Sequence, residues 1–507
     1  MRTPAILLAA VLGIAPAAPA GSQTVNWNQI KGRCSRAIVR VNVVIEEPDL
    51  TRPYLPGSIG RASGTGFFVT DQHIVTNHHV VDGSREITIQ PVYDKEHYKM
   101  RRAARPCPEF DLALLEFASP EERTRFIEDQ GAIEALGWAP DFSGLPGEEV
   151  AALGFGDSDQ LVATRGIVSS WETMSNRASP YLQLAVVIRT DASINPGNSG
   201  GPSVDAEGRV IGVNSYTRVN RENVGLMIPA TTAREVVEAL LRTGEFVKSS
   251  LGIVYQNLTP TLRSALDLDP TQNGVVITHV FPESSAAAAG LAVWDVLSEV
   301  EGRPILYGEV AQERIGKLPF WSVSDTRPAG STVRFTRVGP GGEVGSVDVV
   351  LQAADRRSSA WIAPAVPQET DKEWGYLGGM VITELTQNLL EKMSESRWRF
   401  ELINDLEPGH KTYILTFVEP QTQASEYVTY GWPILYQRVL ELDGVPLDRD
   451  LDRRLAELHS ATAAAAVSVG FEEGLVLRID LAQAREELAA FRRRYTLEAA
   501  PGPATAP

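Results

Sequence analysis

Ser199 lies in a glycine-rich run, Asn195-Pro196-Gly197-Asn198-Ser199-Gly200-Gly201-Pro202. A nucleophilic serine needs a hydroxyl that is free on a tight turn, with backbone N–H groups directed to the same side. Neighbouring glycines permit that close approach of the backbone. The pattern therefore predicts a serine that can form an acyl intermediate, although the run taken alone is equally typical of a plain hairpin loop.

Two further segments supply the groups that such a serine would need. The first is Thr76-Asn77-His78-His79-Val80-Val81, and the second is Phe110-Asp111-Leu112. A neutral imidazole can take the hydroxyl proton, and a carboxylate can fix the tautomer of the imidazole and stabilise the imidazolium. The chain order histidine, aspartate, serine is a known order for this triad. An aspartate before an apolar run is otherwise an ordinary strand-edge residue. Successive side chains diverge, so only one of the two histidines can face both partners, and the spacing does not choose between them.

Short β-type runs separated by turn clusters dominate residues 38–227. Examples are Ala37–Ile45, Gly66–Thr70, Glu86–Gln90, Leu112–Phe117, Glu149–Gly154, Leu182–Ile188 and Arg209–Val213. Many strands at short spacing predict a barrel or a sandwich rather than βαβ units. Apolar residues at helical spacing predict a helix over Ala230–Thr243 that ends at Gly244, and a surface helix over Leu481–Arg494.

Length and composition limit the class of protein. The chain has 507 residues, 43% of them hydrophobic and 22% charged, which at roughly 150 residues per domain suggests about three globular domains. The net charge of −17 repels phosphate backbones and anionic lipid, which argues against nucleic acid as a partner. The two cysteines, Cys34 and Cys107, cannot build a disulfide scaffold or a four-thiolate zinc site. They could pair in an oxidising compartment or remain two separate buried thiols.

The N-terminal segment Met1–Ala20 has the pattern of a secretory signal peptide, with one Arg, an apolar run and the ending Ala18-Pro19-Ala20. An uncleaved anchor is the alternative, although the apolar run is shorter than the about 20 residues that span a bilayer comfortably. No later segment predicts a stable membrane span. We therefore expect secretion across the inner membrane and, for a bacterial source, a periplasmic location. The segment 496–507 is rich in Pro and Ala and predicts a disordered tail.

With these motifs in place, residues 60–245 resemble the protease domain of the HtrA/Deg family of serine endopeptidases. In the units that follow, the closest look is to the plant-type branch of that family. Ser63–Phe67 (SGTGF) resembles the strand before the histidine of that family, Asp191–Asn195 its lead into the nucleophile, and Asn223–Ala230 its last barrel strand. The resemblance implies a trypsin-like domain over 21–245. The implied site residues are catalytic His79, Asp111 and Ser199, and an oxyanion hole at Gly197, Asn198 and Ser199. The family places its histidine directly before the Val-Val pair, so His78 is expected to be structural.

The resemblance also implies a substrate pocket lined by Ile194, Val213, Asn214 and Ser215. No acidic residue falls at its base, so small to medium aliphatic side chains are expected beside the cleaved bond. Burying such a side chain is favourable by about 0.8 kcal/mol per CH₂. The alternative is that Ile194 is an ordinary barrel-core residue.

Residues 250–352 resemble a PDZ domain. The segment Ser250–Ile253 is similar to its carboxylate-binding loop, in which Leu251, Gly252 and Ile253 would hold a peptide C-terminus while the peptide adds as a strand. The alternative is that Leu251 and Ile253 simply begin a strand. Trp294 stands where the pattern usually has Gly, which leaves the local turn open. A linker over 353–370 leads to residues 371–495, which resemble a divergent second PDZ domain without a recognisable carboxylate loop.

The sequence thus predicts a mainly β chain, with a trypsin-like double β-barrel followed by two α+β PDZ-type domains. The resemblance implies an ATP-independent endopeptidase that degrades unfolded or damaged proteins, captures peptide C-termini and assembles as trimers or their multiples. No metal or organic cofactor is expected, and the short stretch 46–60 leaves little room for a long inhibitory loop. The rival hypotheses are a non-catalytic holdase or PDZ scaffold and a dedicated processing protease.

Overall fold

A computed structural model describes residues 25–497. Within that span it leaves out residues 48, 142, 157–159, 175–184, 218–223, 313–314, 326, 354–372, 387–388, 390–410, 430–433, 449 and 462–464. The predicted signal peptide (1–20), nearly all of the predicted linker (353–370) and most of the predicted tail (496–507) therefore lie outside the described residues.

The first strands close into a barrel in the order β1-β2-β3-β6-β5-β4. These strands are β1 (Ile38–Glu47), β2 (Ser58–Phe68), β3 (His73–Thr76), β4 (Ser84–Pro91), β5 (Tyr98–Arg102) and β6 (Ala113–Phe117). Short helices precede, connect or follow these strands: α1 (Trp27–Cys34), η1 (Ser35–Ala37), α2 (His78–Val81), η2 (Pro108–Phe110) and α3 (Pro120–Gln130). Alternate residues of the strands fill its interior, where Val41, Ile89 and Tyr98 are fully buried.

A second barrel follows in the order β10-β11-β12-β9-β8-β7. Its strands are β7 (Glu149–Gly154), β8 (Val162–Met174), β9 (Ala185–Thr190), β10 (Pro202–Val204), β11 (Val210–Thr217) and β12 (Gly225–Pro229). Helix α4 (Ala230–Thr243) packs against β11 and β12 and ends at Gly244, which has the left-handed φ of +80° that glycine adopts without strain. The predicted mainly β fold with a double barrel is confirmed, and α4 begins and ends at the predicted residues.

The two cysteines lie in the apolar core that joins the barrels. Both are free thiols, so the structure realises the second of the two alternatives. Cys34 Sγ approaches the carbonyl of Gly208 (3.8 Å), whereas Cys107 Sγ approaches the carboxylate of Glu109 (3.6 Å). Burial raises the pKa of the Cys34 thiol and raises that of the Cys107 thiol well above 9.0, so neither sulfur is a ready nucleophile.

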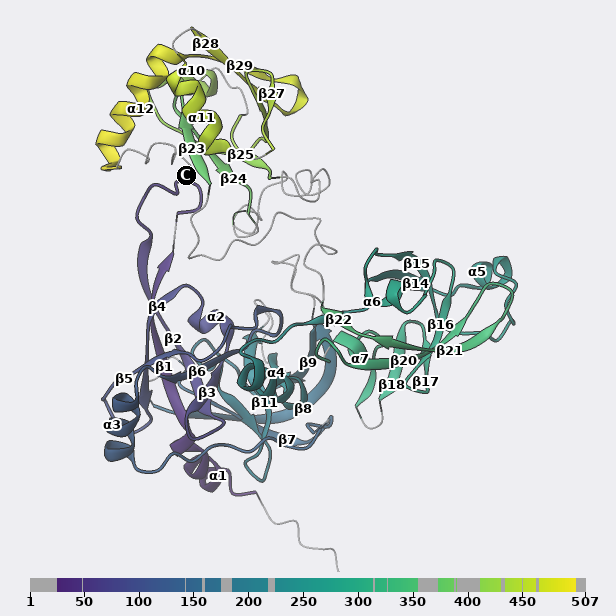
Figure 1. Ribbon diagram of the computed structural model, residues 1–507. Coiled ribbons are helices and arrows are strands. Elements are labelled where there is room, and N and C mark those ends of the chain that lie inside the picture. Colours follow the sequence, from purple (N-terminus) through teal and green to yellow (C-terminus); the bar gives the residue numbers. More distant parts are fainter. Residues whose placement is uncertain are drawn as a thin grey trace, which may run out of the picture.

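The middle unit (249–353) is a separate α+β layer beside the second barrel (Figure 1). Its main sheet has the order β14-β15-β16-β17-β18-β19, with β20 paired to β16 and β21 to β20. The elements are β13 (Ser249–Ser250), β14 (Ile253–Asn257), α5 (Pro260–Ala265), β15 (Val275–Val280), α6 (Ser285–Ala288), β16 (Val296–Val300), β17 (Arg303–Leu306), β18 (Glu309–Gln312), β19 (Gly316–Pro319), α7 (Ser322–Asp325), β20 (Thr332–Val338), β21 (Val344–Val350) and β22 (Gln352–Ala353).

Trp294 adopts the turn that its sequence left open. Its φ is +77°, in the left-handed region that glycine normally occupies. The turn is held by the N–H of Trp294, which donates to Ile277 O (2.9 Å), and by the buried carboxylate of Asp295, which pairs with Arg337 at 2.8 Å. The left-handed backbone conformation costs a bulky residue about 1–3 kcal/mol, and these contacts stabilise Trp294 in it.

The C-terminal unit (373–497) combines a sheet of order β23-β24-β25 with a sheet of order β27-β26-β28-β29. Its elements are β23 (Trp374–Leu377), β24 (Met380–Glu384), β25 (Tyr413–Val418), α10 (Gln423–Thr429), β26 (Val439–Leu442), β27 (Val445–Pro446), α11 (Leu451–Ser460), β28 (Ala466–Phe471), η3 (Glu472–Gly474), β29 (Val476–Asp480) and α12 (Leu481–Tyr495). Helix α12 confirms the predicted surface helix within one residue at its end.

Both later units contact the barrels. Ile315 and Leu318, which precede and lie in β19, are buried with the core residues of the second barrel. The loop between β1 and β2 reaches from the first barrel to the C-terminal unit (Figure 1), where Tyr54 is buried against aromatic side chains. The short stretch between β1 and β2 is thus a contact between units.

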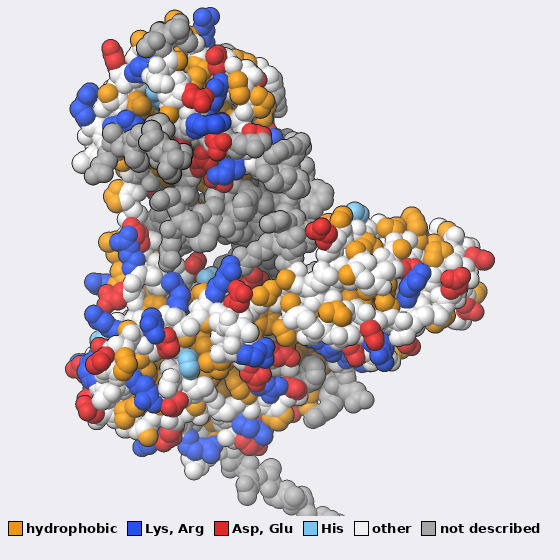
Figure 2. All heavy atoms as spheres, in the orientation of Figure 1, with side chains coloured by type: hydrophobic (Ala, Val, Ile, Leu, Met, Phe, Trp, Pro, Cys, Tyr) orange, Lys and Arg blue, Asp and Glu red, His pale blue; other side chains and the backbone are white. Residues whose placement is uncertain are grey.

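The visible surface carries both signs of charge. Acidic and basic side chains are interspersed over the barrels and the C-terminal unit in Figure 2 rather than gathered into a field of one sign. In the part of the chain that the structure describes, no helix combines the length and apolar character needed to cross a membrane.

Candidate active site

Ser199 lies in the loop between β9 and β10, where the second barrel faces the first. The turn at 195–198 is closed by the N–H of Asn198, which donates to Asn195 O at 3.0 Å. Among the described residues, no acceptor receives the N–H of Gly197 or of Ser199. Two free N–H groups on one tight turn are what an oxyanion requires. The side chain of Asn198, the third predicted member, instead accepts from Gly156 N (2.9 Å) and supports the loop.

Thr65, in β2 of the first barrel, forms hydrogen bonds with the loop that carries Ser199. Its hydroxyl donates to Gly197 O (2.7 Å), and its backbone N–H donates to Ser199 O (2.8 Å). The same hydroxyl accepts the N–H of Phe155 in the second barrel (3.1 Å). Gly64 makes the close approach possible, because a Cβ there would lie 2.7 Å from Val80 and 3.1 Å from Ser199 O. Gly64 and Thr65 of the SGTGF motif therefore join the two barrels.

The carboxylate of Asp111 accepts hydrogen bonds from three donors, two of which belong to His79. Nδ1 of His79 lies 2.8 Å from Oδ2 of Asp111 and 3.0 Å from Oδ1, and the backbone N–H of His79 donates to Oδ1 at 2.9 Å. Ser215 Oγ donates to Oδ2 at 2.6 Å. An ionised carboxylate only accepts hydrogen bonds, so Nδ1 carries a hydrogen, and in the neutral ring Nε2 is left with the lone pair of a base.

The position of Asp111 depends on an unusual backbone. It ends η2 with a φ of +53°, a left-handed value that aspartate tolerates better than most residues. Its backbone carbonyl accepts from His78 N (3.1 Å) and from Asn77 Nδ2 (2.9 Å), which fixes the start of α2 against the carboxylate. Asp111 is 4% exposed, so its bonds to His79 and Ser215 are shielded from water.

Opposing influences set the pKa of His79. Burial lowers it, whereas the hydrogen bond and the charge of Asp111 raise it, and Asp82 adds to the increase. The net result is a pKa above the ordinary value of 6.5. The side chain still keeps 42% of its surface exposed, so a substrate can reach the ring.

His78 points elsewhere. Its Nε2 lies 3.8 Å from the carboxylate of Asp82, and its Nδ1 is buried without a hydrogen-bond partner among the described residues. This arrangement agrees with the prediction that His79, and not His78, meets Asp111.

The Ser199 hydroxyl donates to Ser215 O at 3.1 Å. A turn of this hydroxyl about its own side-chain bond is needed before its proton can go to an imidazole, and catalytic hydrogen bonds of this kind often form only once substrate is bound. Ser215 therefore touches two of the three triad residues. The sequence predicted it only as a pocket residue, because a contact across 104 positions with Asp111 leaves no local pattern.

The other predicted pocket residues are buried. Ile194 is 3% exposed in the core cluster of the second barrel. Val213 and Asn214 are fully buried. The amide of Asn214 accepts from Ser203 Oγ (2.6 Å) and donates to Leu153 O (3.3 Å), so its polar atoms are engaged in structural bonds. A role of these residues in substrate selection stays a prediction.

The predicted peptide loop lies at the start of β14, an end strand of the middle sheet. Leu251 is 4% exposed in the core of that unit. Gly252 has a φ of +68°, and a Cβ there would lie 2.3 Å from that of Ser284. The N–H of Gly252 already donates to Ser250 Oγ (3.1 Å), so a peptide carboxylate would have to replace that hydroxyl. Ile253 begins the strand.

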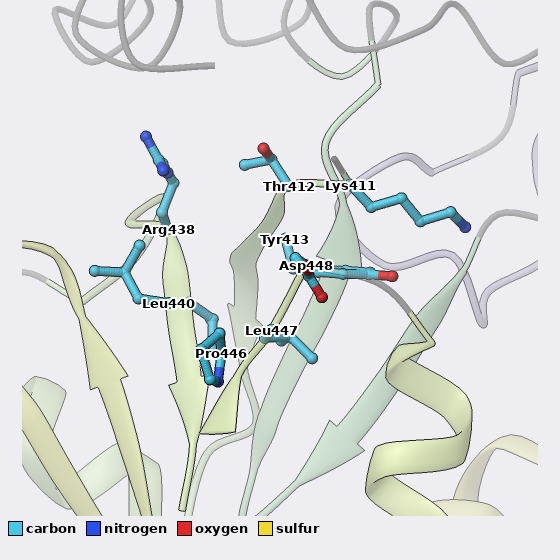
Figure 3. Close-up of a pocket in the computed structure, with 9 residues that line it drawn as sticks. Lys411, Thr412, Tyr413, Arg438, Leu440, Pro446, Leu447 and Asp448 are labelled. Atoms are coloured by element: carbon cyan, nitrogen blue, oxygen red, sulfur yellow. The ribbon is translucent and has the colours of Figure 1, made fainter. Parts of the chain in front are cut away.

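The C-terminal unit has a pocket of about 200 Å³ between β25 and the β26–β27 hairpin (Figure 3). Lys411 and Arg438 lie at its rim, but Lys411 is paired with Glu373 and Glu384, and Arg438 with Glu472. These pairs neutralise the charge that an anionic ligand would need. No group of three His, Cys, Asp or Glu side chains that could hold a metal occurs in the described ranges.

Comparison with known proteins agrees with this geometry. Residues 64–213 match the trypsin-like peptidase domain family. The chain is 32% identical over 261 residues to a protein of Marinomonas sp. named probable periplasmic serine endoprotease DegP-like, covering 51% of this chain and 50% of that one. It is 30% identical over 270 residues to putative protease Do-like 13 of Arabidopsis thaliana, covering 52% of each.

A solved structure titled HtrA-type protease AlgW with decapeptide aligns with 65% of this chain and 99% of its own, at 22% identity and a TM-score of 0.48. The chain thus spans only about half the length of the two curated relatives. The segment that matches the trypsin-like peptidase domain family nevertheless contains all three predicted catalytic residues, and over about half of its length the chain is similar to DegP-type serine endoproteases.

Proposed function

We propose that this chain is an ATP-independent serine endopeptidase that cleaves unfolded or damaged proteins after export from the cytoplasm. The observation that carries the proposal is the chain of contacts Ser199–Ser215–Asp111–His79 beside two free backbone N–H groups. The family match and the names of the relatives support it.

In the proposed first step, His79 takes the proton of Ser199, and Ser199 Oγ attacks the scissile carbonyl carbon. Asp111 keeps the hydrogen of His79 on Nδ1 and stabilises the imidazolium that forms. The imidazolium then gives its proton to the leaving amine, the C–N bond breaks, and an acyl-serine remains. Water attacks this ester with His79 again as the base, which releases the acid and restores the serine.

The negative oxygen of the tetrahedral intermediate would accept hydrogen bonds from the N–H groups of Gly197 and Ser199. Losing one such donor typically costs about 2.7–4 kcal/mol of transition-state stabilisation. Thr65 supports this step indirectly, because it anchors the carbonyls of both residues.

The later units would deliver the substrate. The middle unit is proposed to be a PDZ domain that receives a peptide C-terminus at Leu251–Ile253 and adds the peptide beside β14, where Val254 is 46% exposed. Residues 371–495 are proposed as a divergent PDZ domain. Trimers or their multiples, a cleaved signal peptide at 1–20 and a periplasmic location complete the proposal; the relative from Marinomonas is named periplasmic.

The test compares the mature wild-type chain with Ser199→Ala. The wild type should react with a fluorophosphonate probe and degrade an unfolded protein such as reduced casein, and Ser199→Ala should do neither. Ser63→Ala is the matched control, because it removes an exposed hydroxyl from β2 without touching the site. Equal degradation by wild type and Ser199→Ala, or no labelling of the wild type, would favour a holdase or scaffold.

Cut-site profiling in a denatured proteome separates the remaining rival. Many cuts after small or medium aliphatic residues indicate general degradation. A few cuts in one protein indicate a processing protease.

A further inference from the structure

The loop between β1 and β2 contains a segment that orders itself. Asp49 Oδ1 accepts the backbone N–H groups of Thr51 (3.1 Å) and Arg52 (3.0 Å), and Oδ2 accepts from Arg52 Nε (2.9 Å). The N–H of Leu55 donates to Arg52 O (2.9 Å), which closes a β-turn with Pro53 at its second position. Proline presets the φ of that position, and the aspartate side chain replaces backbone partners. The segment 49–55 is thus held in a turn by its own residues.

Five aromatic side chains of the C-terminal unit lie against this segment. We call them the aromatic face; they are Trp374 and Tyr376 of β23, Phe417 of β25, and Phe491 and Tyr495 of α12. Phe491 stacks on Tyr376 with ring centroids 4.2 Å apart. Arg494 of α12 pairs with the carboxylate of Glu419, next to β25, which fixes the helix over the sheet.

Tyr54 is the centre of the contact. Its ring lies 4.6 Å from Phe491, 4.7 Å from Tyr495 and 5.7 Å from Trp374, all in tilted or edge-on geometry. Such pairs are favourable because the positive ring edge meets a negative face. Only 7% of Tyr54 remains exposed. Two residues earlier, the guanidinium of Arg52 lies 5.7 Å from the ring centre of Phe417.

The ring of Tyr54 makes most of this contact. Its hydroxyl is buried, and burial together with Tyr495 and Glu419 beside it raises the pKa of Tyr54. The chemistry of the face therefore fits a phenyl or phenol ring, with a cation two residues before it, on a turn that is already formed. A preformed turn loses little conformational freedom on docking.

We propose that the aromatic face is a peptide-binding site whose resident ligand is the chain's own segment 49–55, and that this contact is a releasable latch between the first barrel and the C-terminal unit. The segment lies between two strands, so it can leave without breaking the barrel. The tether gives it a millimolar effective concentration at the face, which shields the site from free peptides of the same sequence. The latch itself does not require peptidase activity.

The test uses the full-length mature chain with Ser199→Ala as background, so that no probe is cut. The probe is a fluorescent peptide of the sequence at 49–57 (DLTRPYLPG), and binding is measured by fluorescence polarisation. Tyr54→Ala should empty the site and bind the probe at least tenfold more tightly than the background chain. Tyr54→Phe should behave like the background, because it keeps the ring that packs against Trp374, Phe491 and Tyr495.

Two controls make the outcome specific. Tyr93→Ala removes a tyrosine that is 82% exposed on the first barrel and should leave probe binding at the background level. Adding Trp374→Ala to Tyr54→Ala should abolish binding, and a probe with alanine in place of its tyrosine should not bind any chain. If the Tyr54→Ala chain fails to bind the probe, or the background chain binds it equally well, the proposal is overturned.

Discussion

His79 stands between two opposing effects on its pKa, and their balance sets a pH limit on the proposed chemistry. Burial lowers the pKa, and the hydrogen bond and charge of Asp111 raise it above 6.5, with a further contribution from Asp82. A general base works only when it is neutral. We therefore expect kcat/KM for peptide cleavage to fall as the pH drops through this raised value, and to be constant above it.

Two substitutions separate these effects in a measured pH–rate profile. Asp111→Asn removes the charge that raises the pKa of His79 and leaves burial, which lowers it, so the acidic limit of kcat/KM should move to lower pH. The same substitution should lower kcat by about 10⁴-fold, because the tautomer of His79 is no longer held. Asp82→Asn should move the limit slightly in the same direction and keep most of kcat. An unchanged limit in Asp111→Asn would contradict this account.

Among the elements, strand β2 and the nucleophile loop are joined at Thr65, by its backbone N–H and by its hydroxyl. Thr65→Val keeps a similar shape but leaves Gly197 O and Phe155 N without the bonds that they share through this side chain. Unsatisfied buried groups cost about 1–3 kcal/mol. We expect a loss of stability of that size in urea unfolding, together with a lower kcat because the oxyanion loop loses its anchor.

Thr416→Val is the matched control for that loss. Thr416 is 3% exposed in the C-terminal unit, and its hydroxyl donates to Val381 O (3.3 Å) and pairs with the Thr383 hydroxyl (2.9 Å). Its loss should lower stability by a similar amount and leave kcat nearly unchanged. Equal kcat losses in the two variants would mean that Thr65 matters only for stability.

The same elements show what the sequence could and could not predict. Helix α4 and strand β7 begin and end at the predicted residues, because apolar periodicity and the capping Gly244 are local signals. In contrast, β2 begins eight residues before the predicted Gly66, since residues 58–63 are exposed and show no alternation. The triad followed from motifs, but the contacts of Ser215 with Asp111 and of Tyr54 with α12 join distant segments and leave no trace in spacing.

For the whole molecule, the docking of the middle unit on the second barrel depends on few side chains. Leu318 is 4% exposed among barrel-core residues, whereas Leu306 of the same unit is 38% exposed. Leu318→Ala should destabilise by about 2–5 kcal/mol, as buried leucines do, and Leu306→Ala should change stability by about 0.5 kcal/mol or less. Thermal unfolding measures both values, and limited proteolysis should show earlier separation of the units in Leu318→Ala alone. Equal effects of the two variants would argue against this docking.

Strand β2 has a mechanical consequence. It runs from Ser58, three residues beyond the latch segment, to Phe68, and it carries Thr65 on the way. Antiparallel pairing with β1 extends from Ser58 to Phe67. A pull on the C-terminal unit would therefore load β2 along its axis, where many ladder bonds resist together in shear. The tension would therefore act on β2 next to Thr65, which holds the nucleophile loop. A force applied through a bound chain would thus reach the strand on which the alignment of Ser199 depends.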